Sequence, residues 1–460
     1  MKHIAIAAGI LALCTGTPAF AGDSNADSVT IRKMADQILE QGTCYQNLRV
    51  LCKEVGHRLS GSPEAEKAVQ WGVKAMKEAG ADSVWLQEVK VPNWKRGPIS
   101  MSFTSGGQTF ALKPVALGFS VGTDGKTIEA PVIEVSDWEE IKRLGEQGLL
   151  KDKIVFINHR FNLKNINTFW SYGDCAGYRV KGASDVSRYG AKAMLLRSVS
   201  TATDDHAHTG MMMYNDSLPK IPAIALSLND ANLLSQKLRL RTPVKLQLKA
   251  DCKLLPDATS YNVVGEIRGS EKPGEILTVG GHLDSWDVGE GAHDDGAGCV
   301  QSIEVLHTFK TLQIRPKRTI RAVLFMNEEN GARGGRKYAE LAKTNNEKHI
   351  AAMESDAGGF SPRGVGLEMP EAQKTTVRRW RHLLLPYGVY DFEQEEGGVD
   401  ISFLRKELNT PLLGLLPDSQ RYFDVHHSAN DVFEAVNERE LKLGALTMTA
   451  MIYLLSEYGL

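Results

Sequence analysis

The sequence contains no long hydrophobic run, no large excess of charge of one sign, no internal repeat and no low-complexity tract. No stretch reaches about 18 uninterrupted apolar residues, so we expect no transmembrane helix. The formal net charge of −2 gives no reason to expect a nucleic-acid partner or an anionic membrane surface. The chain has 460 residues, of which 42% are hydrophobic, and this is enough for two or three globular domains.

Residues 1–21 are predicted to form a cleavable signal peptide. Lys2 precedes an apolar stretch from Ile4 to Leu13, and Ala19-Phe20-Ala21 fits the small-x-small pattern of a cleavage site. We therefore expect a secreted or periplasmic protein.

Cysteine is scarce, and the number left after signal cleavage is odd. At least one of the remaining thiols must therefore stay free or pair between chains. Export permits disulfides, and Cys44 and Cys52 are the candidates for a bond because they are the closest pair in sequence.

The mature chain divides into three predicted parts. Residues 22–97 contain two helices around a glycine-rich loop, and their beginning fits either a propeptide or an ordinary first helix. Residues 98–250 alternate short β-rich runs with Gly and Pro turns, which predicts a small β-rich domain inserted into the larger one. Residues 251–460 alternate strands and helices, which predicts an α/β fold with a mostly parallel sheet flanked by helices.

Side chains that bind metals follow three predicted strands of this last part. His282 follows the strand at 275–280, the pair Glu328 and Glu329 follows the strand at 319–326, and Asp356 follows the strand at 349–353. In open α/β sheets the site forms at the carboxyl ends of the strands, so these residues are expected to converge. Imidazole and carboxylate ligands without cysteine suit zinc.

Two further segments complete this set. Asp294 lies in a glycine-flanked turn, and a pair of metal ions needs a bridging group, for which Asp294 is the natural candidate. His426 and His427 are adjacent candidates near the C-terminus, with Asp431 four residues after His427.

These motifs resemble peptidase family M28, a superfamily of zinc aminopeptidases and carboxypeptidases. The resemblance is carried by GGHLDSWD (280–287), GAHDDGAG (291–298), NEE (327–329), ESDAGG (354–359) and HHSAND (426–431). The segments GASDVSRYGAKAMLLRS and HTGMMMY resemble the protease-associated domain inserted in relatives. The resemblance extends over nearly the whole mature chain and implies the phosphorylase/hydrolase-like fold of zinc exopeptidases.

The resemblance also implies two Zn²⁺ ions per chain. Five residues would bind them: His282 and Asp356 at one ion, Glu329 and His427 at the other, and Asp294 between the two. The family's His-Ser/Thr-x-x-Asp pattern favours His427 over His426.

Catalytic and orienting roles follow from the same resemblance. Glu328 would be the general base, because neighbouring side chains on an extended segment alternate and Glu329 faces the metal. Asp284 would accept the second N–H of the His282 ring, and Asp431 would do the same near His427. The family has Thr after this last Asp, whereas Val432 stands here.

The predicted function is that of a zinc-dependent metallo-exopeptidase acting on dipeptides or other short peptides; a homodimer is what the resemblance implies. Two alternatives remain: glutaminyl cyclisation, which uses one zinc on a similar fold, and a non-catalytic binding or receptor protein. The loop at 204–208, DDHAH, looks like a metal motif but has no strand context, so we predict an exposed loop. His208-Thr209-Gly210 matches the relatives, which makes it a candidate for substrate contact.

Overall fold

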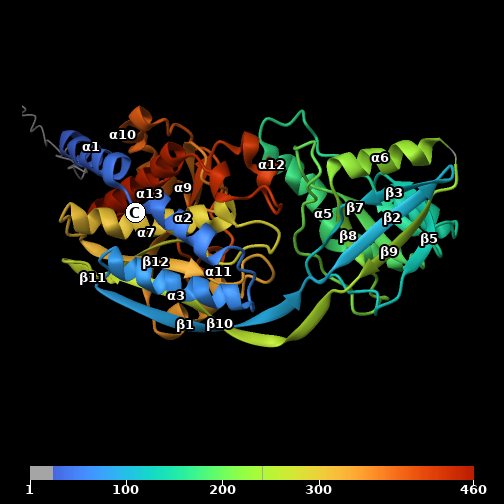
Figure 1. Ribbon diagram of the computed structural model, residues 1–460. Coiled ribbons are helices and arrows are strands. Elements are labelled where there is room, and N and C mark those ends of the chain that lie inside the picture. The colour runs from blue at the N-terminus through green and yellow to red at the C-terminus, as the bar shows by residue number, and fades with distance from the viewer. Residues whose placement is uncertain (1–23, 241) are drawn as a thin grey trace, which may run out of the picture.

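The computed structural model describes residues 24–240 and 242–460, which form two units side by side (Figure 1). Each unit is built around one β-sheet. The predicted signal peptide lies outside the described residues. None of the helices in the described ranges combines the length and the apolar character needed to cross a bilayer.

The larger unit, called the main unit, contains a seven-stranded sheet. Its strands lie in the order β1 (Ser83–Lys95), β10 (Lys253–Ile267), β12 (Arg318–Phe325), β11 (Lys272–His282), β13 (Lys348–Glu354), β15 (Leu412–Pro417) and β14 (Pro362–Glu368). The four central strands from β12 to β15 are parallel, and the outer pairs are antiparallel. The predicted α/β fold with a mixed, largely parallel sheet is therefore confirmed.

This sheet is buried on both faces, as expected of a sheet flanked by helices. In β12, Ala322 and Leu324 belong to the core on one face, whereas Val323 and Phe325 belong to the core on the other. The first face is covered by α1 (Ser24–Gln41), α2 (Cys44–Val50), α3 (Pro63–Glu78), α7 (Ala297–Thr311) and α13 (Glu438–Tyr458), and the second by α8 (Arg333–Thr344) and α11 (Ser402–Leu408). The other α-helices described in this unit are α9 (Glu371–Arg378), α10 (Arg381–Leu384) and α12 (Tyr422–Val425).

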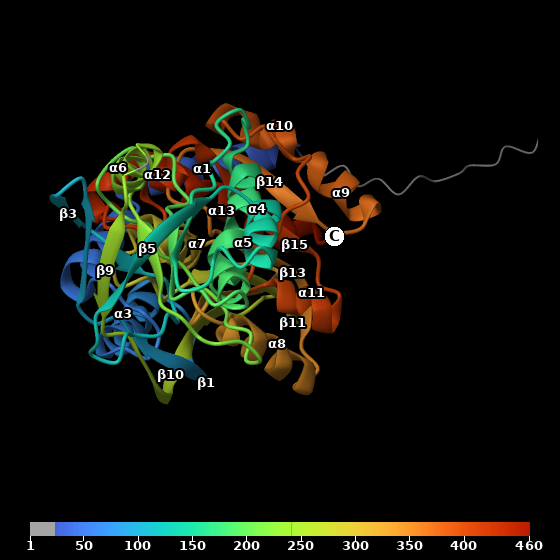
Figure 2. The same cartoon turned by 90° about the vertical axis from the view of Figure 1, so that its right-hand side faces the viewer.

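The second unit contains an eight-stranded sheet whose strands lie within the predicted insertion. Their order is β3 (Gln108–Leu112), β2 (Ile99–Ser105), β9 (Lys245–Ala250), β5 (Ile128–Val135), β6 (Ile154–Ile157), β7 (Ala193–Arg197), β8 (Ala223–Leu226) and β4 (Val115–Ala116). Helix α6 (Leu228–Arg239) packs on one face, and α4 (Trp138–Glu146) and α5 (Thr168–Ser187) pack on the other (Figure 2). That this unit is a protease-associated domain stays a prediction.

The two units are joined through a pair of long antiparallel strands. The chain leaves the main unit at the end of β1 and returns at the start of β10, where Lys95 pairs with Lys253. Both connections therefore lie next to each other at the junction between the units (Figure 1).

The N-terminal part contains more helix than predicted. Two short segments, α2 and a π-helical turn at Leu51–Val55, stand between α1 and α3. The Ser62 hydroxyl accepts the Ala65 N–H at the start of α3, and Pro63 occupies the first turn of the helix.

The suggested disulfide between Cys44 and Cys52 is wrong. Both are free buried thiols, as are the other three cysteines in the described part of the chain. Cys44 begins α2 and Cys52 lies in the π-helical turn that continues it. Eight residues of helix span about 12 Å, which exceeds the Cα separation that a disulfide can bridge.

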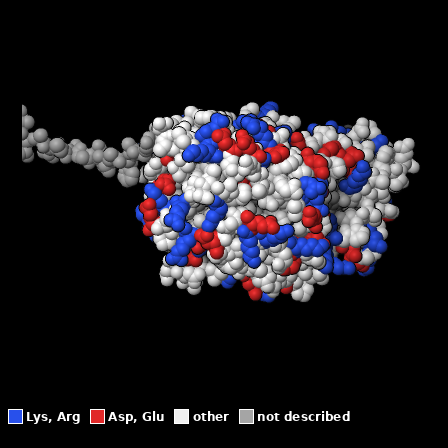
Figure 3. Space-filling view, turned by 60° about the vertical axis from the view of Figure 1, so that its left-hand side comes forward, with Lys and Arg blue, Asp and Glu red and all other residues white. Residues whose placement is uncertain are grey.

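Surface charges of the main unit are mixed in sign. On the face shown in Figure 3, Lys and Arg side chains alternate with Asp and Glu. Several exposed charged side chains of the unit are paired, such as Lys343 with Glu407 at 2.8 Å. No large area of this face therefore carries charge of one sign.

A buried carboxyl group ties the N-terminal helices to α7. Oε2 of Glu304 accepts the backbone N–H groups of Thr43 (2.8 Å) and Cys44 (2.9 Å) and the Thr43 hydroxyl. Burial raises the pKa of Glu304 to about 7. In the folded protein, the Glu304 carboxyl group therefore stays protonated up to a higher pH than in the unfolded chain.

Replacing Glu304 with glutamine is expected to flatten the pH dependence of stability. In the wild type, Glu304 should contribute fully to the free energy of unfolding below about pH 4.5, and this contribution should be lost as the pH rises through 7. The loss is on the order of 3 kcal/mol. Glutamine keeps the acceptor oxygen and does not titrate. Urea unfolding at pH 5, 6, 7 and 8 measures the difference, with the exposed Glu340→Gln as the control. If the free energy of unfolding depended on pH equally in the wild type and in Glu304→Gln, this account would be contradicted.

Candidate metal centre

The strand ends bring the predicted residues together at one edge of the main sheet. His282 is the last residue of β11, and Asp356 follows the end of β13 by two residues. The His282 Nε2 atom lies 3.1 Å from Oδ1 of Asp294 and 3.3 Å from Oδ1 of Asp356. One atom from each of these three side chains thus converges on a common point that suits a metal ion.

A second convergence lies on the other side of Asp294. The His427 Nε2 atom is 3.2 Å from Oδ2 of Asp294 and 3.0 Å from Oε2 of Glu329. The two carboxylate oxygens of Asp294 therefore face two different groups of side chains. Asp294, His427 and Glu329 are all at least nine-tenths buried.

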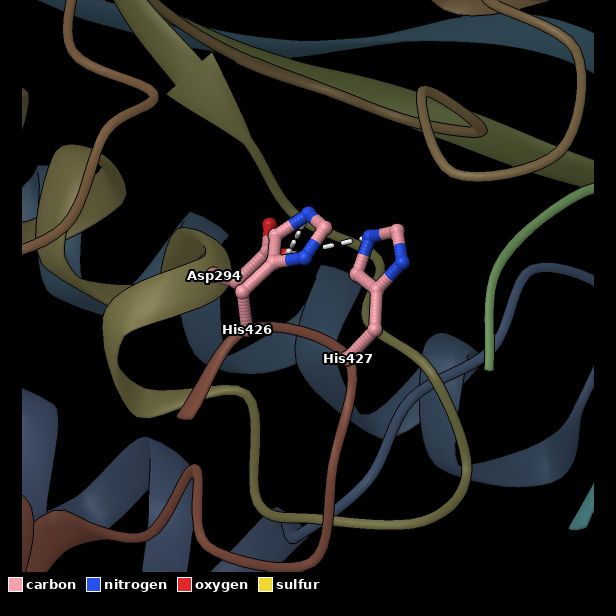
Figure 4. A group of neighbouring side chains, drawn as sticks. All are labelled: Asp294, His426 and His427. Atoms are coloured by element: carbon pink, nitrogen blue, oxygen red, sulfur yellow. Dashed lines mark ion pairs between the residues drawn. The ribbon is translucent and has the colours of Figure 1, made fainter. Parts of the chain in front are cut away.

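The two adjacent histidines are distinguished by their contacts (Figure 4). Both rings approach Asp294, but Nε2 of His426 is 3.7 Å away and makes no ion pair with Glu329. The ring of His426 instead stacks on His427 at 3.6 Å and meets the Tyr172 ring edge-on at 5.2 Å. Both rings form, with Asp294, a group that could hold a metal ion, and the ion pair with Glu329 is made by His427, the histidine that the sequence favours.

The charge balance of the site suits a bound cation. Buried Oδ2 of Asp294 and Oε1 of Glu329 have no hydrogen-bond partner among the described residues. Burial and then the neighbouring Asp294 carboxylate raise the pKa of Glu329 to about 7. Such crowding of buried carboxylates disfavours their ionisation unless positive charge is present. Nitrogen and oxygen donors, with no thiol among them, fit zinc.

Backbone contacts fix the tautomer of both candidate ligand histidines. The Nδ1–H of His282 donates to the backbone carbonyl of Asp284 at 2.9 Å, and the Nδ1–H of His427 donates to the carbonyl of Thr209 at 3.3 Å. In each ring Nε2 is then left as the free electron-pair donor, and it points to the carboxylates.

The contacts of Asp284 and Asp431 differ from those predicted. The Asp284 carboxylate lies 3.9 Å from Nδ1 of His282, whose N–H goes to the backbone carbonyl instead. Its Oδ1 accepts the backbone N–H groups of Asn327 (2.6 Å) and Glu328 (3.0 Å). Asp284 therefore positions the segment that carries Glu328.

Asp431 likewise holds backbone and not a histidine ring. Its two oxygens accept the backbone N–H groups of His293 (2.7 Å) and Asp294 (3.1 Å). On the other side, the Asp295 carboxylate accepts the N–H groups of His282 (3.0 Å) and Gly298 (2.9 Å). These carboxylates fix the turn that presents Asp294.

A loop of the second unit reaches the candidate metal centre; the sequence suggested that it contacts substrate, but not that it holds the backbone of the two histidines. The backbone N–H of Thr209 donates to the His427 carbonyl at 2.9 Å, and Nδ1 of His208 donates to the His426 carbonyl at 2.6 Å. The prediction of an exposed loop holds for Asp205 and His206 but is wrong for His208, which is buried. Burial lowers the pKa of His208 to about 4, so its ring stays neutral.

Glu328 and Glu329 point to different surroundings. Both side chains line a cavity of about 570 Å³ that is open to the centre, but of the two only Glu329 makes an ion pair with His427. This cavity also borders Asp294, Asp356 and His427. Among the described residues Glu328 makes no ion pair with His282 or His427, so its carboxylate is available to exchange protons.

Comparison with known proteins identifies the family. The model described as Peptidase family M28 matches residues 262–452. Carboxypeptidase Q from Homo sapiens is 35% identical over 417 residues, which cover 91% of this chain and 86% of that protein, and the Xenopus laevis protein gives the same values. The chain belongs to peptidase family M28.

Solved structures agree with membership of the M28 family. A Peptidase M28 precursor from Shewanella amazonensis SB2B has a TM-score of 0.90 and 32% identity, with 94% of this chain and 97% of that chain covered. BSAP, a zinc aminopeptidase from Bacillus subtilis, has a TM-score of 0.66 at 18% identity, with 90% and 95% covered, which shows a shared fold. The M28 chain is thus a metallo-exopeptidase similar to carboxypeptidase Q.

Proposed function

We propose that this M28 enzyme is a zinc-dependent exopeptidase that hydrolyses dipeptides or short peptides at a two-metal centre. The observation that carries the proposal is the Asp294 carboxylate, because its two oxygens face His282 and His427 separately. A bridging carboxylate of this kind is what two metal ions about 3.5–4 Å apart require. His282 and Asp356 would hold one ion, and Glu329 and His427 the other.

The side chains around the centre can perform the proton transfers of peptide hydrolysis. When bound, zinc supplies the Lewis acidity that lowers the pKa of a water molecule and polarises the scissile carbonyl. Glu328, held by the hydrogen bond from its backbone N–H to Asp284, accepts the proton of the attacking water on its carboxylate. It then delivers this proton to the nitrogen of the leaving amine. The 570 Å³ cavity is of a size that suits a short peptide.

Removal of metal tests this proposal. Dialysis against a chelator is expected to abolish hydrolysis of free dipeptides, and added Zn²⁺ should restore it up to two ions per chain. Elemental analysis and peptide hydrolysis followed by mass spectrometry measure both quantities. Full activity at one zinc per chain, together with cyclisation of N-terminal glutamine, would favour the alternative transferase reaction. Unchanged peptide hydrolysis in metal-free protein would refute the proposal.

A further inference from the structure

Arg96 lies at the junction of the two units and binds a residue of the main unit beside the metal centre. It is the first residue after β1, where the chain crosses to the second unit (Figure 1). Its Nε atom donates to both oxygens of Asp287, at 3.0 and 3.1 Å, and its Nη2 atom donates to Oδ1 at 2.6 Å. Asp287 lies in the loop that leads from His282, at the end of β11, to Asp294. The ion pair therefore ties the junction to the segment between two candidate ligands.

The same guanidinium fixes Thr209 of the second unit. Nη2 of Arg96 donates to the Thr209 hydroxyl at 3.3 Å, and this hydroxyl donates to the Ala116 carbonyl at 2.8 Å. Nη1 of Arg96 donates to the same carbonyl, so the three groups form a closed ring of hydrogen bonds. Only 11% of the Arg96 side chain and 17% of the Asp287 side chain are exposed, so water competes little with these contacts.

Thr209 in turn holds His427 by two hydrogen bonds. The backbone N–H of Thr209 donates to the His427 carbonyl at 2.9 Å, and the Thr209 carbonyl accepts the His427 Nδ1–H at 3.3 Å. The position of Thr209 therefore determines both the backbone position and the ring direction of His427. A shift of Thr209 would move the His427 Nε2 atom, which faces Asp294 and Glu329.

Trp286, the residue before Asp287, connects the ion pair to the His427 ring. The Trp286 ring meets the His427 ring edge-on at 5.9 Å, and the Arg96 guanidinium lies 5.9 Å from the Trp286 ring centroid. Gly118 of the second unit leaves the space for this ring, because a Cβ atom added there would overlap it. The ion pair and the candidate ligand therefore belong to one packed cluster at the boundary between the units.

We propose that the Arg96–Asp287 ion pair positions His427, through Thr209, as a ligand at the zinc position that it shares with Glu329. This inference rests on the proposed function and gives the junction of the two units a role in metal binding. Arg96 and Asp287 are positioning residues, because neither is among the described residues that line the metal-centre cavity. A guanidinium suits this role because its planar fork fixes direction as well as distance.

Zinc titration of metal-free protein tests this role at one position at a time. Asp356→Asn weakens the position of His282, and adding Arg96→Gln to it should lower the remaining zinc affinity by roughly 10- to 100-fold. Glu329→Gln weakens the position of His427, and adding Arg96→Gln to it should change the remaining affinity by less than about threefold. Arg96→Lys, which keeps the charge without the fork, should cause a smaller loss than Arg96→Gln.

Asp287→Asn removes the other partner of the ion pair and should cause the same selective loss. Because both residues act through one contact, the double variant Arg96→Gln/Asp287→Asn should lose little more zinc affinity than either single variant. Additive losses would show that the two residues do not act as a pair and would overturn the proposal.

Arg318→Gln is the matched control. Arg318 is similarly buried and pairs with Glu275 at 2.7 Å, but it lies at the start of β12, at the opposite edge of the main sheet from the metal centre. Its replacement should lower the free energy of unfolding, measured with urea, without a selective loss of zinc from either position.

The possible results separate the two proposals. Unchanged zinc affinity at the His427 position in folded Arg96→Gln, or equal losses at both positions, would overturn the positioning role. If Arg96→Gln fails to fold, unchanged zinc affinity in Asp287→Asn would overturn it as well. Failure of the zinc-loaded wild type to hydrolyse any peptide would instead refute the proposed exopeptidase function, because the zinc affinities test Arg96 independently of hydrolysis.

Discussion

Replacing Glu328 with glutamine is expected to lower kcat for dipeptide hydrolysis by roughly 10²- to 10⁴-fold while two zinc ions stay bound. Glutamine has nearly the same shape and keeps the backbone N–H that donates to Asp284. It cannot accept a proton from water, so only the proton transfers are removed. Steady-state kinetics with zinc analysis of the same preparation measures both effects.

The neighbouring residue provides the matched comparison for this prediction. Glu329→Gln makes the same chemical change one position later, but Glu329 lies 3.0 Å from His427 and Glu328 does not contact that ring. We expect Glu329→Gln to lose zinc from one position, whereas Glu328→Gln keeps it. Full peptide hydrolysis by zinc-loaded Glu328→Gln would exclude Glu328 as the general base.

Replacing Asp294 with alanine is expected to weaken zinc binding at both positions and to remove measurable hydrolysis. Its two oxygens face the two groups of ligands, 3.1 Å from His282 and 3.2 Å from His427. Loss of a residue that merely orients a ligand typically weakens metal binding 10- to 100-fold, so loss of the bridging ligand should exceed roughly 100-fold. Zinc titration of metal-free protein gives the affinity at each position.

Asp356→Asn is the control for the bridging role. Asp356 contacts His282 but not His427, so its replacement should weaken one zinc position and spare the other. If Asp294→Ala lost only one zinc ion, Asp294 would not bridge the two positions.

The sequence predicted the main fold well because its signals are local and repeated. Strand β12 is mostly apolar, which is typical of burial on both faces, and the structure places alternate residues in separate cores. The same logic brought His282 and Asp356 together, because parallel strands that end at one edge carry their following residues to the same place.

Contacts that depend on backbone direction were not predictable in this way. The sequence indicated that Asp284 lies near His282, but only coordinates show that its carbonyl meets the ring while its carboxylate holds Glu328. His208 was misjudged because its neighbours Asp205 and His206 are polar and exposed, whereas its burial arises from contact with the other unit.

The pairing of Lys95 with Lys253 has a consequence for how such a chain can be assembled. Residues 96–252 connect two paired strands of the main sheet, as the turn of a hairpin does, because the two ends of that segment are already neighbours. An inserted segment of almost any length can be accommodated at such a position with little further loss of chain entropy, since the entropic cost of closing a loop depends only weakly on its length. Replacement of this inserted unit by another domain should therefore leave the main fold intact. Catalysis should survive only if the new domain also forms the hydrogen bonds to the backbone of His426 and His427.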